Sequence, residues 1–273
     1  MNRRSLLLGL AACACGSRSQ GNAFAEAALN VARRAGQSTI DESSSRDELA
    51  RLADVLRVEL NRAPERSVAS VFGEVLFERL GFAREVVDTS LRYVLLPSVL
   101  RARRGNCVGL GTLTIALAEM LGRSAQGVLM PGHFYVRFSE RGGPRNLELL
   151  RRGEAMSDAW YAARFPIPGG SAPEYARPLS SHEVQGVIEY DVGNERRRQL
   201  RLEEARTAYT RAVTLFPQLS EAHASLAATL QLLGRFHESA ASYAHARAAN
   251  PNLPGLEWNR ALLDQERGVA TAR

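Results

Sequence analysis

Residues 103–111 read Arg103-Arg104-Gly105-Asn106-Cys107-Val108-Gly109-Leu110-Gly111, and they place one cysteine between a polar turn and an apolar segment. The apolar segment runs to Leu121, and its leucines recur at spacings of three and four residues, which predicts a buried helical face. We therefore expect Cys107 in the first turn of a core helix. Unpaired N–H groups and the helix dipole favour a thiolate at that position, so the sequence predicts a lowered pKa for the Cys107 thiol.

The sequence pattern changes from helical to extended after this helix. Upstream, a capping box from Ser45 to Glu48 predicts a helix to about Leu60, and a second helix is expected over residues 67–80. Residues 133–138 then alternate between two faces, and a Gly-Gly-Pro turn at 142–144 leads to a partner strand at 146–150. Helices followed by an antiparallel sheet indicate an α+β domain, which we place at residues 46–180.

This domain contains the parts of a thiol active site. Cys107 would be the nucleophile and His133, at the start of its strand, would be the base that pairs with it. The third member, which orients the imidazole, would be Glu148 or Asn146 on the following strand. The sequence does not fix the strand register, so both candidates stay open. Asp158 is a weaker candidate for the same role.

The turn before Cys107 supplies groups that stabilise negative charge. The Cys107 backbone N–H and the Asn106 side chain could bind an oxyanion. Arg101, Arg103 and Arg104 would favour the thiolate further if they point inward. No metal and no other cofactor is expected, because the histidines of the last third lie at spacings unsuited to metal binding. These histidines are His182, His223, His237 and His245.

The last third of the chain, residues 181–267, repeats itself with a period of 34 residues. Residues one period apart match in small, aromatic and proline positions, as in Tyr209/Tyr243 and Pro217/Pro251. This period and pattern resemble the tetratricopeptide repeat, with repeats at about 186–219 and 220–253 and a closing helix. Glu189 and Arg196 depart from the pattern, which usually has aromatic or apolar residues there. Two repeats are too few to stand alone, so we expect them to pack on the α+β domain and to bind a protein or peptide partner.

The first fifteen residues have the basic, apolar and small-residue order of an export signal. Arg3 and Arg4 precede an apolar run over residues 5–12 that is too short to span a bilayer. Cys13 follows small residues, as in a bacterial lipoprotein signal, and the two arginines also resemble a twin-arginine signal. We therefore expect export to the cell envelope or periplasm, a lipid on Cys13 that anchors the chain to a membrane, and a linker over residues 16–45.

The charge pattern argues against nucleic-acid binding. The chain carries 35 Lys plus Arg and 29 Asp plus Glu, which gives a net charge of +6. From Glu183 to the end, eleven arginines are balanced by eleven acidic residues. A nucleic-acid footprint is clustered and unopposed, so no nucleic-acid partner is expected.

The segments around Cys107 and His133 resemble the bacterial transglutaminase-like core family. The resemblance rests on residues 100–107, on the helix that follows, and on the run Gly127-Val128-Leu129-Met130-Pro131-Gly132-His133-Phe134. It implies a papain-like fold in which a cysteine opens a helix, a histidine opens a strand and an aspartate lies on the next strand. It suggests Cys107 as nucleophile and His133 as base. This sequence has Glu148 or Asn146 where the aspartate is expected, and some members of the family lack the cysteine.

Two functions of different classes follow. The first is an exported thiol enzyme that hydrolyses or transfers an amide of a peptide or protein, with the repeats binding a partner. The second is a non-catalytic adaptor in which the α+β domain is a retired enzyme fold. They differ in whether the Cys107 sulfur lies beside a His133 nitrogen in a groove open to solvent.

Overall fold

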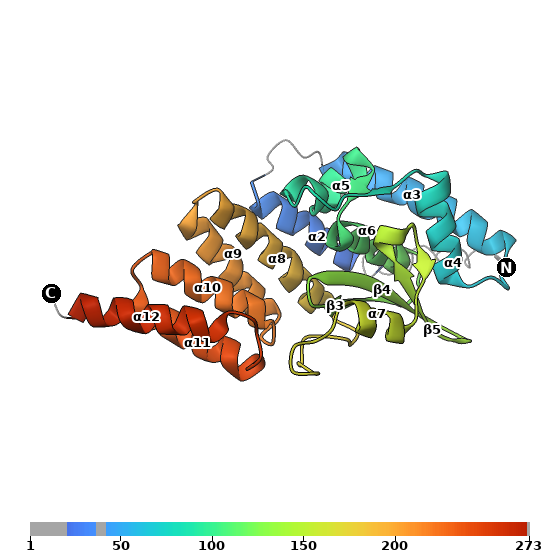
Figure 1. Cartoon of the computed structure of the whole chain (residues 1–273). Coiled ribbons are helices and arrows are strands. Elements are labelled where there is room, and N and C mark those ends of the chain that lie inside the picture. The colour runs from blue at the N-terminus through green and yellow to red at the C-terminus, as the bar shows by residue number, and fades with distance from the viewer. Residues whose placement is uncertain (1–20, 37–41, 272–273) are drawn as a thin grey trace, which may run out of the picture.

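The computed structural model describes residues 21–36 and 42–271, with helices surrounding one small antiparallel sheet (Figure 1). The expected export segment, with Cys13, lies outside the described residues. The fold is α+β, as the sequence predicts. The sheet and its covering helices form one end of the molecule, and a stack of helices forms the other end (Figure 1).

The described residues form helices of different lengths and several short strands. The first half contains the helices α2 (Ala23–Arg34), α3 (Glu42–Arg62), α4 (Val68–Gly73), the π-helix η1 (Glu74–Arg79), the 3-10 turn η2 (Leu91–Tyr93), α5 (Leu96–Ala102) and α6 (Cys107–Met120). The strands are β1 (Ala83–Arg84), β2 (Arg104–Gly105), β3 (Ala125–Met130), β4 (His133–Glu140), β5 (Gly143–Glu148) and β6 (Glu154–Ala155). The 3-10 turn η3 (Leu149–Arg151) and α7 (Asp158–Arg164) lead to α8 (Ser181–Arg198), α9 (Leu202–Leu215), α10 (Ser220–Leu232), α11 (Phe236–Ala249) and α12 (Leu256–Thr271).

The main sheet has the order β3-β4-β5-β6 and is antiparallel throughout. Phe134, Val136 and Phe138 point from β4 into the main core, where α6 packs against the sheet. Tyr135 points to the opposite face and packs with Tyr161 of α7 in a separate cluster. This is the alternation that the sequence predicts for a strand with two packed faces.

The α6 helix begins at Cys107, as predicted. Asn106 is its N-cap, since the side-chain oxygen accepts a hydrogen bond from the Gly109 N–H at 2.9 Å. The prediction of a single buried face is too narrow, because all residues from Val108 to Ala118 are buried. The sheet, α2, α5 and α8 all pack against α6, so every side of the helix is covered.

The helix α2 corrects the expectation that residues 16–45 form a linker. Phe24, Leu29 and Val31 are buried in the same core as α6. The Phe24 N–H donates to the Glu119 carboxylate at 2.9 Å, which ties α2 to the end of α6. Residues 23–34 are therefore a structural helix, because their apolar and small side chains allow close packing on α5, α6 and α8.

The helices from α8 onward pack as consecutive antiparallel neighbours, most closely α8 with α9 and α10 with α11. Gly193 allows the first pair to approach closely, since a Cβ there would lie 2.5 Å from the Tyr209 ring. A capping box is present at the start of α8, where Ser180 and Glu183 cap each other's backbone. Glu189 is buried because it pairs with Arg34 of α2 at 2.7 Å.

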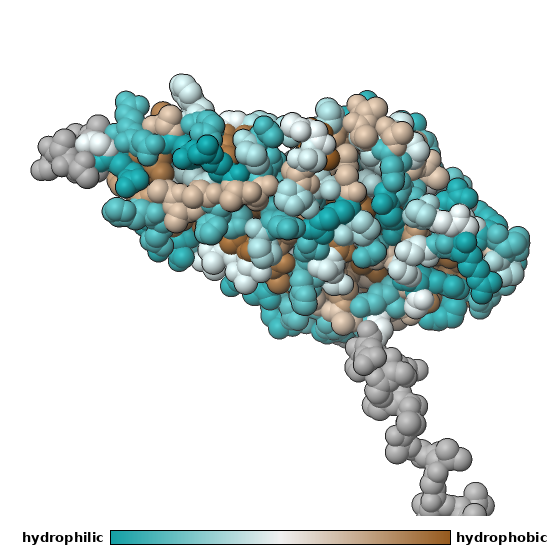
Figure 2. Space-filling model, turned by 90° about the horizontal axis from the view of Figure 1, so that it is seen from below, coloured by the Kyte–Doolittle hydropathy of each residue, from teal (hydrophilic) through white to brown (hydrophobic). Residues whose placement is uncertain are grey.

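The face of the molecule shown in Figure 2 is mostly hydrophilic, with hydrophobic residues visible in small separate areas. Within the part of the chain that the structure describes, no helix has both the length and the hydropathy needed to cross a bilayer.

Candidate active site

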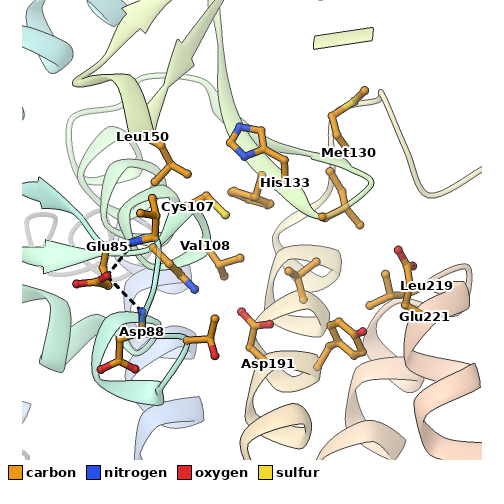
Figure 3. Close-up of a pocket in the computed structure, with 18 residues that line it drawn as sticks. Glu85, Asp88, Cys107, Val108, Met130, His133, Leu150, Asp191, Leu219 and Glu221 are labelled. Atoms are coloured by element: carbon orange, nitrogen blue, oxygen red, sulfur yellow. Dashed lines mark hydrogen bonds between the residues drawn. The ribbon is translucent and has the colours of Figure 1, made fainter. Parts of the chain in front are cut away.

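A cavity of about 460 Å³ lies in front of the N-terminus of α6, and Cys107 and His133 both line it (Figure 3). Its wall combines segments that are far apart in the sequence. Residues 85–89 and the start of α6 form one side, and the β3–β4 hairpin forms another. The helical end of the molecule closes it through Val187, Tyr190 and Asp191 of α8 and through Leu219 and Glu221 at α10.

His133 is held by a buried carboxylate. The distance from His133 Nε2 to Glu148 Oε2 is 2.7 Å, and the two residues are only 5% and 1% exposed. The other Glu148 oxygen, Oε1, accepts a hydrogen bond from the Leu150 N–H at 2.9 Å, which fixes the carboxylate. The imidazole also stacks on Phe165 with a centroid distance of 4.3 Å. Because Nε2 is taken by Glu148, Nδ1 is the nitrogen that remains for a second partner.

Asn146, the alternative third member, lies elsewhere on the sheet. Its side chain accepts a hydrogen bond from Arg137 Nε at 2.8 Å and donates to Asp158 Oδ1 at 2.7 Å. Asp158 also pairs with Arg137. The register pairs Asn146 with Arg137, which places its side chain farther along β4 than the His133 end. The structure thus brings Glu148 to His133, and neither Asn146 nor Asp158 bonds to it.

The thiol of Cys107 differs from the expected thiolate. Burial raises the pKa of Cys107 to about 12, and the negative charges of Asp191 and Glu148 act in the same direction. Hydrogen bonds from the Phe134 and Val108 N–H groups lower it, but burial outweighs them. Since the side chain is only partly exposed and lies among apolar neighbours, the loss of hydration exceeds the benefit of the helix N-terminus. The prediction of a lowered thiol pKa is therefore wrong.

The arginines before Cys107 do not compensate for this burial. Arg103 donates to the Leu80 carbonyl at 2.7 Å and pairs with Glu48, and Arg104 pairs with Glu85 at 3.1 Å. None of Arg101, Arg103 and Arg104 lines the cavity. At neutral pH the thiol is thus protonated, and a base must remove its proton when it attacks.

Groups for an oxyanion lie beside the thiol. Cys107 is the first residue of α6, so its N–H has no partner within the helix. The Asn106 oxygen is used to cap the helix, which leaves its amide NH2 as the donor that can face a ligand in the cavity. The predicted roles of Cys107 and Asn106 are compatible with this geometry.

Two neighbours of the site could not be found from the sequence. Tyr161 of α7 has a buried hydroxyl with no hydrogen bond to a described residue, and burial raises its pKa, with the charge of Glu148 acting in the same direction. Asp191 of α8 has a buried oxygen with no partner among the described residues and faces the cavity. In the sequence Asp191 is one charge among many on a long helix, so no spacing connects it to Cys107.

The described residues contain no group of three or more His, Cys, Asp or Glu that could hold a metal ion.

Comparison with known proteins identifies a family and several similar solved structures. The chain is similar to the structure titled "Crystal structure of menin reveals the binding site for Mixed Lineage Leukemia (MLL) protein", with 13% sequence identity and a TM-score of 0.38. That similarity covers 84% of this chain and 64% of the menin chain. No curated protein sequence matches the chain. A family model described as the transglutaminase-like superfamily matches residues 43–185, a range that includes Cys107, His133 and Glu148. Since this match spans more than half of the sequence, the chain belongs to the transglutaminase-like superfamily.

Proposed function

We propose that the protein is a thiol-dependent amide hydrolase or acyl transferase that acts on peptides or proteins. The observation that carries the proposal is that Cys107 and His133 line one cavity, while the buried Glu148 carboxylate holds the His133 imidazole. A purely structural histidine gains little from a buried carboxylate partner, because burying both groups costs hydration free energy. A histidine that becomes charged during a reaction needs that partner.

The geometry supports a two-step acyl transfer. His133 Nδ1 takes the thiol proton as the Cys107 sulfur attacks the amide carbon, and the Cys107 N–H and Asn106 NH2 stabilise the oxyanion. His133 then gives the proton to the amide nitrogen, the C–N bond breaks, and a thioester remains on Cys107. Water or an amine attacks the thioester while His133 takes its proton, and the sulfur leaves as the thiol. Glu148 stabilises the imidazolium in both steps.

A base role for His133 predicts faster labelling of the thiol. In a chain with Cys13→Ser and Cys15→Ser, iodoacetamide at pH 7 should label Cys107 about tenfold faster in the unaltered site than in His133→Ala, because base assistance offsets the raised thiol pKa. Mass spectrometry of the labelled chain measures the rate. His182→Ala, an exposed histidine on α8, is the matched control and should label at the unaltered rate. Equal rates in all three chains would remove the base role.

The second candidate function is the non-catalytic adaptor. The raised pKa of Cys107 favours it, because a protonated and partly buried thiol also suits a core residue. In that case the helices from α8 onward would carry the function. The labelling experiment separates the two candidates.

We also propose that residues 181–267 form two tetratricopeptide repeats with a closing helix, joined to a transglutaminase-like domain at 46–180, and that the repeats bind a protein or peptide partner. Support comes from the helix spacing, since α9 and α11 begin at Leu202 and Phe236, one 34-residue period apart. Further support comes from the close packing of Gly193 on Tyr209.

Export and lipid anchoring through Cys13 are part of the same proposal, because residues 1–15 have the order of a lipoprotein signal. Cys13→Ala should move the protein from the membrane fraction to the aqueous fraction, since the chain would lose its lipid attachment point. Cell fractionation measures this, with Cys15→Ala as the control that stays in the membrane fraction. Membrane retention of the Cys13→Ala protein would contradict lipid anchoring at this cysteine.

A further inference from the structure

The cavity at Cys107 is acidic although the chain is basic. Four carboxylates line it, and none of its lining residues within the described part of the chain is an arginine. The chain as a whole has a net charge of +6. The lining carboxylates are Glu85, Asp88, Asp191 and Glu221. A cavity with one sign of charge and apolar walls concentrates ligands of the opposite sign.

Three of the four carboxylates have partners in the protein. Glu85 accepts hydrogen bonds from three successive N–H groups of its own loop and pairs with Arg104. Asp88 accepts one from the Ser90 N–H at 2.8 Å. Glu221 accepts one from the Tyr175 hydroxyl. These bonds satisfy the three carboxylates, so none of the three requires a ligand as a partner.

Asp191 differs from the other three. Its Oδ2 atom is buried and has no hydrogen bond to any described residue, although the Asn194 side chain acts on the carboxylate and lowers its pKa. Figure 3 shows its carboxylate pointing from α8 into the cavity, toward the side on which Cys107 lies. The nearby cation is Arg198, whose guanidinium is already bonded to Glu195 and to the Thr89 carbonyl at 3.0 Å. An unpaired buried acceptor has lost its hydration without a replacement bond, so a donor that arrives with a ligand would offset that loss.

We propose that Asp191 binds a positively charged group, an ammonium or a guanidinium, of the substrate whose amide lies at Cys107. This inference rests on the proposed function and names the class of its substrate. Three observations support it: the unpartnered oxygen, the excess of carboxylates, and the position of Asp191 opposite the thiol. A metal ion does not fit, because the described residues offer no three-ligand group. Asp191 lies outside residues 43–185, so the part of α8 beyond the family match supplies the selection.

The site also couples the charge of the substrate to the reactivity of the thiol. Burial is the largest cause of the raised pKa of Cys107, and the charge of Asp191 is the second largest. Burial raises the pKa of Asp191 itself to about 7, with Arg198 and Asn194 opposing the shift. A cation bound to Asp191 would cancel the repulsion that the carboxylate exerts on a thiolate. A neutral ligand would leave that repulsion in place.

Charged thiol reagents test the proposal without any turnover. In the full chain with Cys13→Ser and Cys15→Ser, the rates of Cys107 modification by 2-aminoethyl methanethiosulfonate and by neutral methyl methanethiosulfonate are measured at pH 8. Each rate is divided by the rate for a free thiol in solution. The normalised preference for the cationic reagent should be about tenfold, equivalent to about 1.4 kcal/mol. In Asp191→Asn it should fall to about one, while the rate with the neutral reagent rises because the opposing charge is gone.

Two variants serve as controls. Asp88→Asn makes the same charge change in the same cavity at a carboxylate that has its own partner, and it should keep the preference. Asp191→Glu keeps the negative charge and should keep most of the preference for the cationic reagent. A preference that survives in Asp191→Asn, or that is absent from the unaltered site, would overturn the proposal. A Cys107 thiol that neither reagent modifies would also overturn the proposal. Because labelling needs no catalysis, failure of the proposed enzyme activity would not alter these results.

A change in the labelling rate identifies the source of the cation. Nα-acetyl-lysine amide carries a side-chain ammonium, Nα-acetyl-arginine amide carries a guanidinium, and glycylglycine amide carries an N-terminal ammonium. Each is added at millimolar concentration before the neutral reagent. The compound that changes the labelling rate of the unaltered site, by covering the thiol or by cancelling the charge of Asp191, but does not change the rate of Asp191→Asn, names the substrate group. If none of them changes the rate, Asp191 is not a binding site for a substrate cation.

Discussion

Replacing Glu148 with glutamine should lower the rate of acylation of Cys107 by about 10²–10⁴-fold while the protein stays folded. The Glu148 carboxylate accepts the proton on His133 Nε2 at 2.7 Å, and that bond leaves Nδ1 unprotonated to act as the base. A glutamine amide can turn its NH2 toward Nε2, which would move the imidazole proton to Nδ1. His133 could then no longer take the thiol proton, and the imidazolium would lose its counter-charge.

Release of nitrophenolate from p-nitrophenyl acetate in a single turnover measures this acylation, with Cys107→Ala as the baseline. Glutamine has nearly the same shape as glutamate and can still accept the Leu150 N–H, so the melting temperature should change little. Asn146→Ala is the comparison variant. It breaks bonds to Arg137 and Asp158 and should lower stability more than the acylation rate. If Asn146→Ala abolished acylation and Glu148→Gln did not, the third member of the site would be reassigned.

Replacing Gly109 with alanine should lower the free energy of unfolding by about 2–3 kcal/mol. An added Cβ would lie 2.2 Å from the Tyr93 carbonyl oxygen and 2.8 Å from a Val99 methyl carbon, and the first of these atoms belongs to the backbone. The gain in helix propensity from Gly to Ala is only about 1 kcal/mol, so the clash outweighs it. The Tyr93 carbonyl also accepts the Asn106 N–H at 2.9 Å, so a shift would disturb the start of α6.

Urea denaturation followed by circular dichroism gives the free energy of unfolding. Gly268→Ala is the matched control, because Gly268 lies in α12 and an added Cβ would meet no atom within 4 Å. That variant should be neutral or slightly stabilising. Since Cys107 lies two positions before Gly109, Gly109→Ala should also slow the labelling of the thiol. Unchanged stability would mean that α6 and the η2 turn do not approach as closely as described.

Much of the fold follows from local patterns. The periodicity after Cys107 predicts a helix with its correct start, and the alternation over residues 133–138 predicts both faces of β4. These predictions succeed because each depends on which face of one element is apolar. The role of residues 23–34 does not follow from the local pattern, because the burial of their apolar face depends on α5, α6 and α8, which are distant in the sequence.

The residues of the candidate site also divide into those that local patterns identify and those that only the tertiary structure identifies. Cys107 and His133 can be chosen from the sequence because each follows a turn and begins an element. The choice between Glu148 and Asn146 depends on where the side chains of β5 fall along β4, and only the three-dimensional arrangement gives that information. The thiol pKa was mispredicted because a helix N-terminus is a local feature, whereas burial comes from all the surrounding elements.

The sequence by itself determined the order of elements, the start of the α6 helix and the pair of residues that can act as nucleophile and base. Only the tertiary structure decided the third member of the site, the charge state of the thiol and the presence of Asp191 in the cavity. The reason is physical: helix and strand signals act over a few residues, whereas hydration, charge and hydrogen-bond partners depend on what packs nearby. Asp191 is 84 positions from Cys107, and no pattern along the chain reveals that α8 lies across the cavity from α6.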